Sequence, residues 1–267
     1  MVDKNNIPVV ILCGGKGTRL REETETIPKP MVLIGGKPIL WHIMKIYSHY
    51  GFNKFFLLLG YKGEKIKSYF LEYPWENHDF NIKTKNREIA SLSNEDIEDW
   101  EISLLDTGLD SLTGRRLFLI KNLLKDYDNF MLTYGDGVSD VNLNELLNFH
   151  LSRNNLITIT GVHSKSKQGK INHENGLISD FKEKPVLHDL FNGGFMVFNK
   201  EALSYISEEN TMLEYDLIPK LVIQRKVGLY QHNGFWQSMD TFQDKELLED
   251  LWKENPYWRI WNENCKG

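Results

Sequence analysis

The sequence predicts an α/β fold in which a mostly parallel sheet is flanked by helices. Two kinds of segment indicate it: short strands with continuously apolar runs, at 9–13 and 55–59, typical of strands buried on both faces, and segments with a helical period between them. Alternation of this kind is the signature of βαβ units. The chain has 267 residues, of which 41% are apolar and 26% are charged, a composition typical of folded globular proteins and not of disordered or collagenous chains.

The first half of the chain carries the more regular pattern. The strand at 8–13 ends in glycine, and the helix expected at 38–50 places Ile39, Ile43 and Ile46 on one side and stops at Gly51. The elements expected next are strands at 54–60, 101–105 and 130–134 and helices at 64–73 and 113–124. The parallel part of the sheet should therefore come from this half.

The second half is less regular, and we expect mixed strand pairing there, in a smaller β region. Its expected elements are strands at 156–162, 176–181 and 193–198 and helices at 142–153, 213–225 and 244–253. No repeat or linker divides the chain, so we predict a single domain over 1–267, with an excursion from the main sheet at 72–100. An aromatic C-terminal tail, 254–267, packs either against the body or against another subunit.

The balance of charge excludes several classes of partner. The 32 basic and 37 acidic side chains give a net charge of −5 without a long block of one sign, so we expect neither nucleic acid nor an anionic membrane as partner. The longest apolar stretches, 9–13 and 55–59, are far shorter than the roughly 20 residues that cross a bilayer. The N-terminus lacks the apolar core of a signal peptide, and Cys13 and Cys265 cannot form a disulfide framework, so we expect a cytoplasmic protein.

The strongest chemical signal is the loop after the first strand, Cys13-Gly14-Gly15-Lys16-Gly17-Thr18-Arg19-Leu20. Glycines at the carboxyl end of a parallel strand let backbone N–H groups approach an anion closely, so we interpret the loop as a phosphate cradle. It matches neither the dinucleotide fingerprint, which requires glycine at the position of Leu20, nor the P-loop, which ends in glycine, lysine and a hydroxyl residue. From the glycines alone, a tight turn with an exposed Arg19 is an equal alternative.

A second cation follows this loop. Lys29 lies between Pro28 and Pro30, which fix the backbone around it and thereby its ammonium. The fork of Arg19 and the compact charge of Lys29, aimed at one loop, suit a triphosphate. Without the glycine loop upstream, we would interpret Lys29 as a solvated loop lysine.

Further motifs extend this pattern along most of the chain. In order, they are Gly14-Gly15-x-Gly17-Thr18-Arg19-Leu20, Pro28-Lys29-Pro30-Met31, Gly35-Gly36-Lys37-Pro38-Ile39-Leu40, Trp41-His42-Ile43-Met44-Lys45, Gly60-Tyr61-Lys62-Gly63, Asp106-Thr107-Gly108, Thr133-Tyr134-Gly135-Asp136-Gly137 and Gly234-Phe235-Trp236-Gln237-x-Met239-Asp240-Thr241. In these motifs the chain resembles the sugar nucleotidyltransferases and, among them, the glucose-1-phosphate cytidylyltransferases. The resemblance implies a Rossmann-like, GT-A-like α/β fold with a mixed β region for the sugar phosphate, and a homo-oligomer.

The resemblance also implies a reaction. An oxygen of α-D-glucose 1-phosphate attacks the α-phosphorus of CTP in line and pyrophosphate leaves, giving CDP-glucose for dideoxysugar or surface polysaccharide synthesis. The implied cofactor is Mg²⁺, with Asp136 and Asp240 as its ligands. Without the resemblance, Asp136 is interpreted as a turn residue and Asp240 as a helix N-cap. The acidic pair Asp126 and Asp128 mimics the D-x-D motif of glycosyltransferases but precedes its strand, so we interpret it as a solvated helix end.

Individual roles follow from the same resemblance. The expected catalytic cations are Arg19, Lys29 and Lys184, and Lys184 contacts the phosphate of the sugar phosphate. Glu183, Asn192 and Gly193 complete the sugar-phosphate site, with a surface charge pair and a turn as the alternative interpretations. The expected nucleotide site comprises Leu12, Cys13, Gly14, Gly15, Gly17, Thr18, Thr107, Thr113, Arg116 and Gly135.

The chain departs from the cytidylyltransferase pattern in three places, mostly on the sugar side. They are Lys167-Gln168-Gly169-Lys170-Ile171, Met212-Leu213-Glu214-Tyr215-Asp216, and Arg115 in place of a glycine. Two alternatives therefore stay open: the same reaction with another sugar 1-phosphate or phosphate acceptor, or with UTP or dTTP, and a non-catalytic nucleotide-binding module. A glycosyltransferase would need a D-x-D motif at a strand end, which the sequence lacks.

Overall fold

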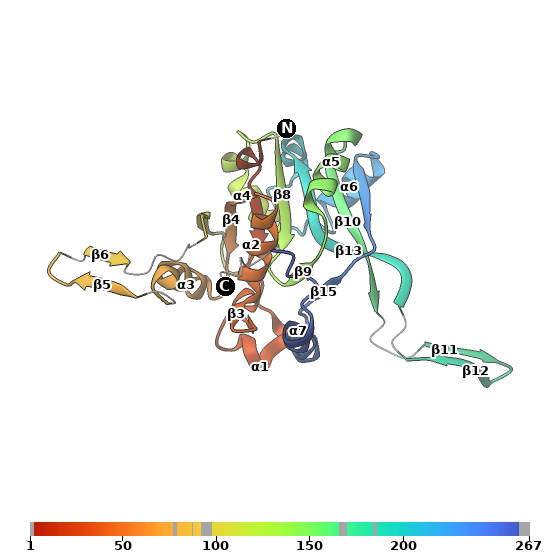
Figure 1. Ribbon diagram of the computed structural model, residues 1–267. Coiled ribbons are helices and arrows are strands. Elements are labelled where there is room, and N and C mark those ends of the chain that lie inside the picture. The colour runs from red at the N-terminus through yellow and green to blue at the C-terminus, as the bar shows by residue number, and fades with distance from the viewer. Residues whose placement is uncertain are drawn as a thin grey trace.

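The computed structural model describes residues 3–76, 79–86, 88–91, 98–165, 170–183 and 186–261. Its centre is a seven-stranded sheet with the order β14-β10-β13-β8-β1-β4-β7 (Figure 1). The strands are β1 (Val9–Leu12), β4 (Lys54–Leu59), β7 (Glu101–Asp106), β8 (Asn129–Tyr134), β10 (Ile157–Lys165), β13 (Val186–Asn199) and β14 (Val227–His232). Four of the six neighbouring pairs are parallel, and β13 runs antiparallel to both of its neighbours. The predicted α/β fold with a mostly parallel sheet is confirmed.

The position of β1 explains its continuous apolar sequence. Its four residues are buried between β4 and β8, with Ile11 paired in register with Leu57 and Thr133. Val9 and Ile11 belong to one apolar core, whereas Val10 and Leu12 belong to a second core on the opposite face. Successive side chains of a strand alternate between faces, so a strand with both faces covered is apolar throughout.

Helices pack on both faces of the sheet and contribute to the two cores. They are α1 (Arg21–Thr24), α2 (Ile39–His49), α3 (Gly63–Glu76), α4 (Thr113–Leu124), α5 (Leu143–Arg153), α6 (Leu217–Ile223) and α7 (Phe242–Glu254). Buried side chains of α2, α5 and α7 belong to the first core, and those of α4 and α6 to the second. The helix predicted at 213–225 begins later, at Leu217, because residues 213–216 form a turn in which the Leu213 N–H donates to Thr113 Oγ1 at 2.9 Å.

Short elements connect the sheet to the loops that follow it. They are the strands β2 (Leu33–Ile34), β3 (Lys37–Pro38), β9 (Gly137–Ser139) and β15 (Trp236–Ser238) and the 3₁₀ helices η1 (Lys4–Asn6), η2 (Thr18–Leu20), η3 (Lys29–Met31) and η4 (Lys200–Tyr205). Strand β9 pairs with β15, so the chain just after β8 lies beside the chain just before α7. This pairing matters for the site because it places Asp136 near Asp240.

Two hairpins project from opposite sides of the body in Figure 1. One pairs β5 (Phe80–Lys83) with β6 (Glu88–Ser91), within the predicted excursion at 72–100, and the other pairs β11 (Lys170–Glu174) with β12 (Leu177–Lys182). All residues of β5, β11 and β12 are exposed. The expectation of mixed pairing in the second half is confirmed, but the strand predicted at 176–181 lies outside the main sheet. The strand predicted at 193–198 is the end of the much longer β13, which pairs with β10 across two register shifts.

The described part of the aromatic tail packs against the body of the same chain. Trp258 is fully buried and Trp261 nearly so, and both rings contact the ring of His42 on α2. The Trp258 Nε1–H donates to His42 Nδ1 at 3.3 Å. Residues 262–267, which include Cys265, lie outside the described residues. Over the ranges that the structure describes, no helix combines the length and apolar character needed to span a membrane.

Candidate active site

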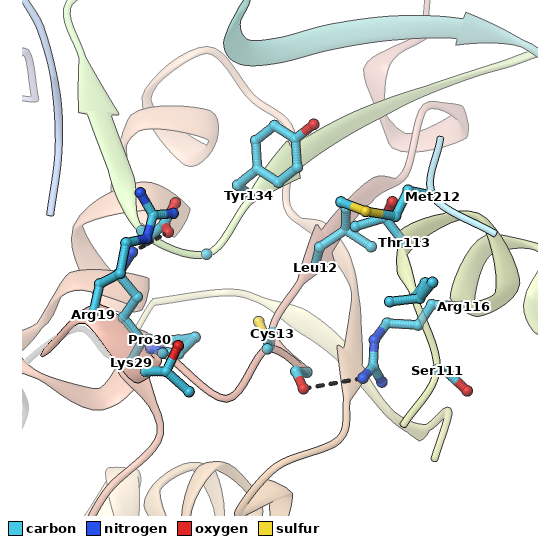
Figure 2. A pocket seen from close by; sticks show the side chains of 17 residues that line it. Leu12, Cys13, Arg19, Lys29, Pro30, Ser111, Thr113, Arg116, Tyr134 and Met212 are labelled. Atoms are coloured by element: carbon cyan, nitrogen blue, oxygen red, sulfur yellow. Dashed lines mark hydrogen bonds and ion pairs between the residues drawn. The ribbon is translucent and has the colours of Figure 1, made fainter. Parts of the chain in front are cut away.

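A cavity of about 330 Å³ opens at the carboxyl ends of β1 and β8. Figure 2 shows Arg19 and Lys29 on one side of this cavity and Thr113, Met212 and Arg116 on the other. The lining residues are Leu12, Cys13, Gly14, Gly15, Gly17, Thr18, Arg19, Lys29, Pro30, Ser111, Leu112, Thr113, Arg116, Tyr134, Gly135, Asp136 and Met212. Ligands of open α/β sheets bind at this edge. All residues predicted for the nucleotide site except Thr107 therefore lie around one cavity.

Arg116 explains why the loop after β1 begins with glycine. Its Nη1 donates to the carbonyls of Leu59 and Gly108 and to Thr107 Oγ1, at 2.8, 2.9 and 2.6 Å, and its Nη2 donates to the carbonyl of Gly14 at 3.0 Å. A Cβ on Gly14 would lie 2.1 Å from the guanidinium carbon, so a larger residue there would displace the guanidinium from its four hydrogen bonds. Arg116 thus ties the ends of β1, β4 and β7 together.

Two predicted residues are buried by this arrangement. Thr107 is 2% exposed, donates to the Leu59 carbonyl at 2.7 Å and supports Arg116 behind the cavity wall instead of lining it. Cys13 lines the cavity, but burial raises the pKa of its thiol, and the charge of Asp136 raises it further. The thiol therefore stays protonated and is not a nucleophile.

The charged part of the site centres on Lys29. Its Nζ lies 2.6 Å from Asp136 Oδ2 and 2.8 Å from Asp240 Oδ1, and Arg19 Nη2 lies 3.1 Å from the same Asp240 oxygen. Burial alone would lower the pKa of Lys29, but the two carboxylates outweigh it and the pKa is raised. Lys29 is therefore a permanent ammonium, and the interpretation as a solvated loop lysine is wrong, since its side chain is 11% exposed.

Asp240 is held in place by the start of α7. The helix N-cap is Thr241, not Asp240, so the alternative interpretation of Asp240 as the cap is wrong. Asp244 Oδ2 accepts the backbone N–H groups of Asp240 and Thr241 at 3.1 and 2.8 Å, and the Met239 N–H donates to the Asp136 carbonyl at 2.8 Å. These bonds fix the backbone on which both carboxylates are carried.

The two carboxylates fit a hard divalent cation. Because Asp136 Oδ2 and Asp240 Oδ1 both bond the Lys29 Nζ, the two carboxylates converge on one point, as the ligands of a shared ion do. Small hard cations are commonly held by one or two carboxylates together with waters and substrate phosphates. No group of three or more His, Cys, Asp or Glu side chains, within the described ranges, is arranged to hold a metal ion.

The residues predicted for the sugar phosphate are only partly brought together. Asn192 Oδ1 accepts the Gly194 N–H at 2.9 Å, its Nδ2 lies 3.5 Å from the hydroxyl of the cavity residue Tyr134, and the Gly193 carbonyl accepts Trp236 Nε1–H at 2.7 Å. Glu183 is exposed and is not among the residues that line the cavity. Lys184, like the departure at 167–169, lies outside the described residues.

Known proteins resemble this chain over nearly its whole length. The family described as Nucleotidyl transferase matches residues 8–258. The chain belongs to this family. It is 42% identical over 254 residues to the "Probable glucose-1-phosphate cytidylyltransferase" of Bacillus subtilis (strain 168), covering 94% of this chain and 99% of that protein. It is 40% identical over 255 residues to the glucose-1-phosphate cytidylyltransferase of Salmonella typhi, covering 94% and 98%. The family and the enzyme class implied by the motifs are confirmed.

Solved structures support the fold of this nucleotidyltransferase. HddC from Yersinia pseudotuberculosis, complexed with GMP-PN, matches with a TM-score of 0.67 at 19% identity over 92% of this chain and 99% of that one. The CTP:phosphocholine cytidylyltransferase of Streptococcus pneumoniae matches with a TM-score of 0.60 at 18% identity over 92% and 99%. At these identities the likeness concerns the fold alone.

Sequence reasoning missed several residues of the nucleotidyltransferase site. Tyr134, Pro30, Ser111, Leu112 and Met212 line the cavity without having been assigned to it. Tyr134 ends β8 inside a matched motif, which was an available signal, whereas Met212 lies in a segment that departs from the expected pattern.

Glu214 was missed as well, and it joins two walls of the cavity. Its carboxylate accepts from the Tyr134 hydroxyl and, at 2.7 Å, from Thr113 Oγ1. Burial and then the charge of Glu214 raise the pKa of Tyr134, so its hydroxyl stays protonated. The Thr113 proton is likewise engaged, and its oxygen also accepts the Leu213 N–H at 2.9 Å, so a ligand at either hydroxyl would meet an acceptor and not a free donor.

Proposed function

We propose that this protein transfers the cytidylyl group of CTP to α-D-glucose 1-phosphate, giving CDP-glucose and pyrophosphate. The observation that carries the proposal is the convergence of Arg19, Lys29, Asp136 and the glycine loop on one cavity, in a chain at least 40% identical to glucose-1-phosphate cytidylyltransferases over nearly its whole length. Such an arrangement of cations, backbone N–H groups and carboxylates suits transfer of a nucleotidyl group between phosphates.

In this proposal the glycine loop and the two cations bind the triphosphate. Gly14, Gly15 and Gly17 let the backbone approach the phosphates, the Arg19 fork bridges phosphate oxygens, and Lys29 supplies a compact charge. The sugar phosphate is then placed so that one of its oxygens faces the α-phosphorus opposite the departing pyrophosphate. Positioning and neutralisation of charge supply most of the rate enhancement, and no covalent enzyme intermediate is needed.

Asp136 and Asp240 are the residues that would hold Mg²⁺. The ion, when bound, neutralises charge that develops on the transferred phosphate and on the leaving pyrophosphate. The carboxylates need a defined separation for this role, and the bonds from Asp244 and Met239 supply it on the protein side. Lys184 is proposed to hold the phosphate of the acceptor, and Asn192 and Gly193 the sugar.

The β11–β12 hairpin carries an exposed apolar surface that would suit the proposed homo-oligomer. Exposed apolar side chains on the β11–β12 hairpin include Ile171, Leu177, Ile178 and Phe181. The product, a nucleotide sugar, suits dideoxysugar or surface polysaccharide synthesis. The proposed reaction requires neither the homo-oligomer nor a particular use of the product.

The test is a matrix of four nucleoside triphosphates against a panel of sugar 1-phosphates, measured as pyrophosphate release with Mg²⁺. We expect the highest kcat/KM for CTP with α-D-glucose 1-phosphate and loss of turnover in Asp136→Asn. A site that hydrogen-bonds the cytosine edge leaves groups unpaired when UTP enters, so UTP should be a poor substrate. Efficient turnover of UTP or dTTP would contradict the assigned base, and CTP turnover confined to another acceptor would contradict the assigned sugar.

A further inference from the structure

The ammonium of Lys29 lies where a divalent cation would contact the protein. It bonds Asp136 Oδ2 at 2.6 Å and Asp240 Oδ1 at 2.8 Å, and Arg19 Nη2 approaches the second of these oxygens at 3.1 Å. One oxygen of each carboxylate is thus already the acceptor of a cationic side chain. A metal ion that bound both carboxylates would have to displace the Lys29 ammonium.

The backbone of Lys29 is fixed, whereas its side chain is able to move. Lys29 begins the 3₁₀ helix η3, with Pro28 before it and Pro30 after it, and its carbonyl accepts the Val32 N–H at 3.1 Å. Its Cβ packs against the glycine loop, 3.3 Å from where a Cβ on Gly17 would lie. Rotation about the flexible four-carbon stem is therefore the route by which the ammonium changes partners.

Cationic side chains already neutralise most of the negative charge around the carboxylates before any ligand arrives. Asp136 and Asp240 contribute two negative charges, and Lys29 and Arg19 contribute two positive charges within 3.1 Å of them. Asp244 adds a third carboxylate, which accepts the Asp240 N–H at 3.1 Å. A divalent cation added alone would leave this part-buried cluster with excess positive charge, which is costly at low effective dielectric constant. A triphosphate brings the missing negative charge and offers new acceptors to both cationic side chains.

We propose that Lys29 is a tethered counter-ion that keeps divalent cations off the carboxylate pair until a nucleotide binds. The triphosphate then draws the ammonium from Asp136 and Asp240, and the metal ion takes its place between the carboxylates. This inference rests on the proposed function for the metal role of the two aspartates. Metal binding to the protein then depends on the nucleotide. Lys29 bonds to the carboxylates before the nucleotide binds and to the phosphates afterwards.

Two simpler roles for Lys29 make different predictions. If Lys29 only bound phosphate, its replacement would leave metal affinity in the absence of nucleotide unchanged. If Lys29 only held the carboxylates in the geometry that a metal needs, its replacement would weaken metal binding. The counter-ion role alone predicts that removing the charge strengthens metal binding to the nucleotide-free protein.

The experiment measures Mn²⁺ binding to the nucleotide-free full chain by the electron paramagnetic resonance signal of free Mn²⁺. The variants are Lys29→Met and Lys29→Gln, which remove the charge, Lys29→Arg, which keeps it, and the double variant Lys29→Met with Asp136→Asn. Lys54→Met is the matched control, because Lys54 also pairs with a carboxylate, Glu101 at 3.1 Å, but at the start of β4, away from the carboxyl edge of the sheet. Thermal denaturation identifies any variant that does not fold, and the Gln variant replaces the Met variant in that case.

We expect weak Mn²⁺ binding to the wild type, at least tenfold tighter binding to Lys29→Met and Lys29→Gln, and wild-type behaviour in Lys29→Arg and Lys54→Met. The gain should disappear in the double variant, which locates it at the carboxylate pair. The inference is overturned if neutral replacements bind Mn²⁺ no more tightly than the wild type, if the gain survives Asp136→Asn, or if the wild type already binds tightly without nucleotide. Because no substrate is present, this result stands apart from the substrate matrix: a negative matrix with a positive Mn²⁺ series would refute the assigned reaction and keep the counter-ion.

Discussion

The side of the cavity assigned to the nucleotide and the side assigned to the sugar phosphate are built differently. On the nucleotide side, Arg116 is 3% exposed and joins the ends of three parallel strands through four hydrogen bonds. On the sugar side, Asn192 and Glu183 are exposed, and the Asn192 amide reaches Tyr134 only at 3.5 Å. If the two assignments hold, we expect the nucleotide site to be preformed and the sugar site to depend more on the ligand itself.

The carboxylate pair is assigned to the metal ion, which serves both substrates, so its loss should have the largest effect. Asp136→Asn and Asp240→Asn keep the shape of each side chain and remove the charge that holds a metal. We expect kcat/KM to fall on the order of 100-fold or more in each variant, with the fold retained but a lowered thermal midpoint, because the part-buried Lys29 ammonium loses one of its two carboxylate partners. The measurement is pyrophosphate release against Mg²⁺ concentration, and near-wild-type rates at limiting Mg²⁺ would refute the metal assignment.

Replacement of Arg116 tests how rigid the nucleotide side is. In Arg116→Met, the carbonyls of Leu59, Gly108 and Gly14 lose a buried donor, and we expect a loss of about 3 kcal/mol in the free energy of unfolding. Urea denaturation measures it. The neighbouring Arg115→Met is the matched control, since the Arg115 guanidinium lies over Phe118 and donates to the Glu208 carbonyl instead of to the strand ends, and the change should cost about 1 kcal/mol or less. Equal effects of the two variants would show that the guanidinium does not hold the strand ends together.

Local patterns in the sequence predict part of the site, but contacts between distant residues are not predictable in this way. The strands at 9–12 and 54–59, and the glycine loop between sheet and cavity, follow from apolar runs and from glycine chemistry, which are local signals. The ion pair between Lys29 and Asp240 joins residues 211 positions apart, and no local pattern contains it. That Lys29 and Asp240 belong to one site followed only from motifs matched in order along the chain.

The errors have physical causes as well. Thr107 was assigned to the nucleotide because it lies in a matched motif, but its hydroxyl is used by Leu59 and Arg116, which only the packing of three strand ends reveals. Glu214 was missed because its partners, Tyr134 and Thr113, come from distant elements. The β11–β12 hairpin alternates like a sheet strand, yet tertiary pairing keeps it outside the main sheet.

Arg19 and Lys184 test the division between the nucleotide side and the sugar side, because Arg19 is assigned to the triphosphate and Lys184 to the phosphate of the acceptor. We expect Arg19→Ala to raise KM for CTP and Lys184→Ala to raise KM for glucose 1-phosphate. The loss of one charge-assisted contact should cost about 1.5–3 kcal/mol in each case. Initial rates with either substrate varied measure the split, and an effect of both variants on the nucleotide alone would refute the division of roles.

Asp244 tests whether the start of α7 serves the metal site or only the helix. Asp244→Ala removes the acceptor of the Asp240 N–H and one half of the capping box, whereas Thr241→Ala removes the cap and keeps the bond to Asp240. Both should lower stability by about 1 kcal/mol. We expect only Asp244→Ala to raise the Mg²⁺ concentration needed for half-maximal rate, by about tenfold. An equal rise in both variants would reduce Asp244 to a helix cap.

The smallest effect is expected on the sugar side. Asn192 carries two separable contacts: its Oδ1 accepts the Gly194 N–H at 2.9 Å, which supports a backbone with φ of +79° at Gly194, and its Nδ2 points to the Tyr134 hydroxyl at 3.5 Å. Asn192→Ala loses both, so we expect KM for glucose 1-phosphate to rise by a few-fold, equivalent to about 1 kcal/mol, with KM for CTP unchanged. Asn192→Asp keeps an acceptor for the Gly194 N–H, loses the amide donor and adds a negative charge, so a KM equal to that of the wild type assigns the effect to the turn. If Asn192→Ala raised KM for CTP as much as for the sugar phosphate, the two sides would form one continuous site. The hydrogen bonds of Arg116 would then distinguish the two sides in packing but not in the substrate that each binds.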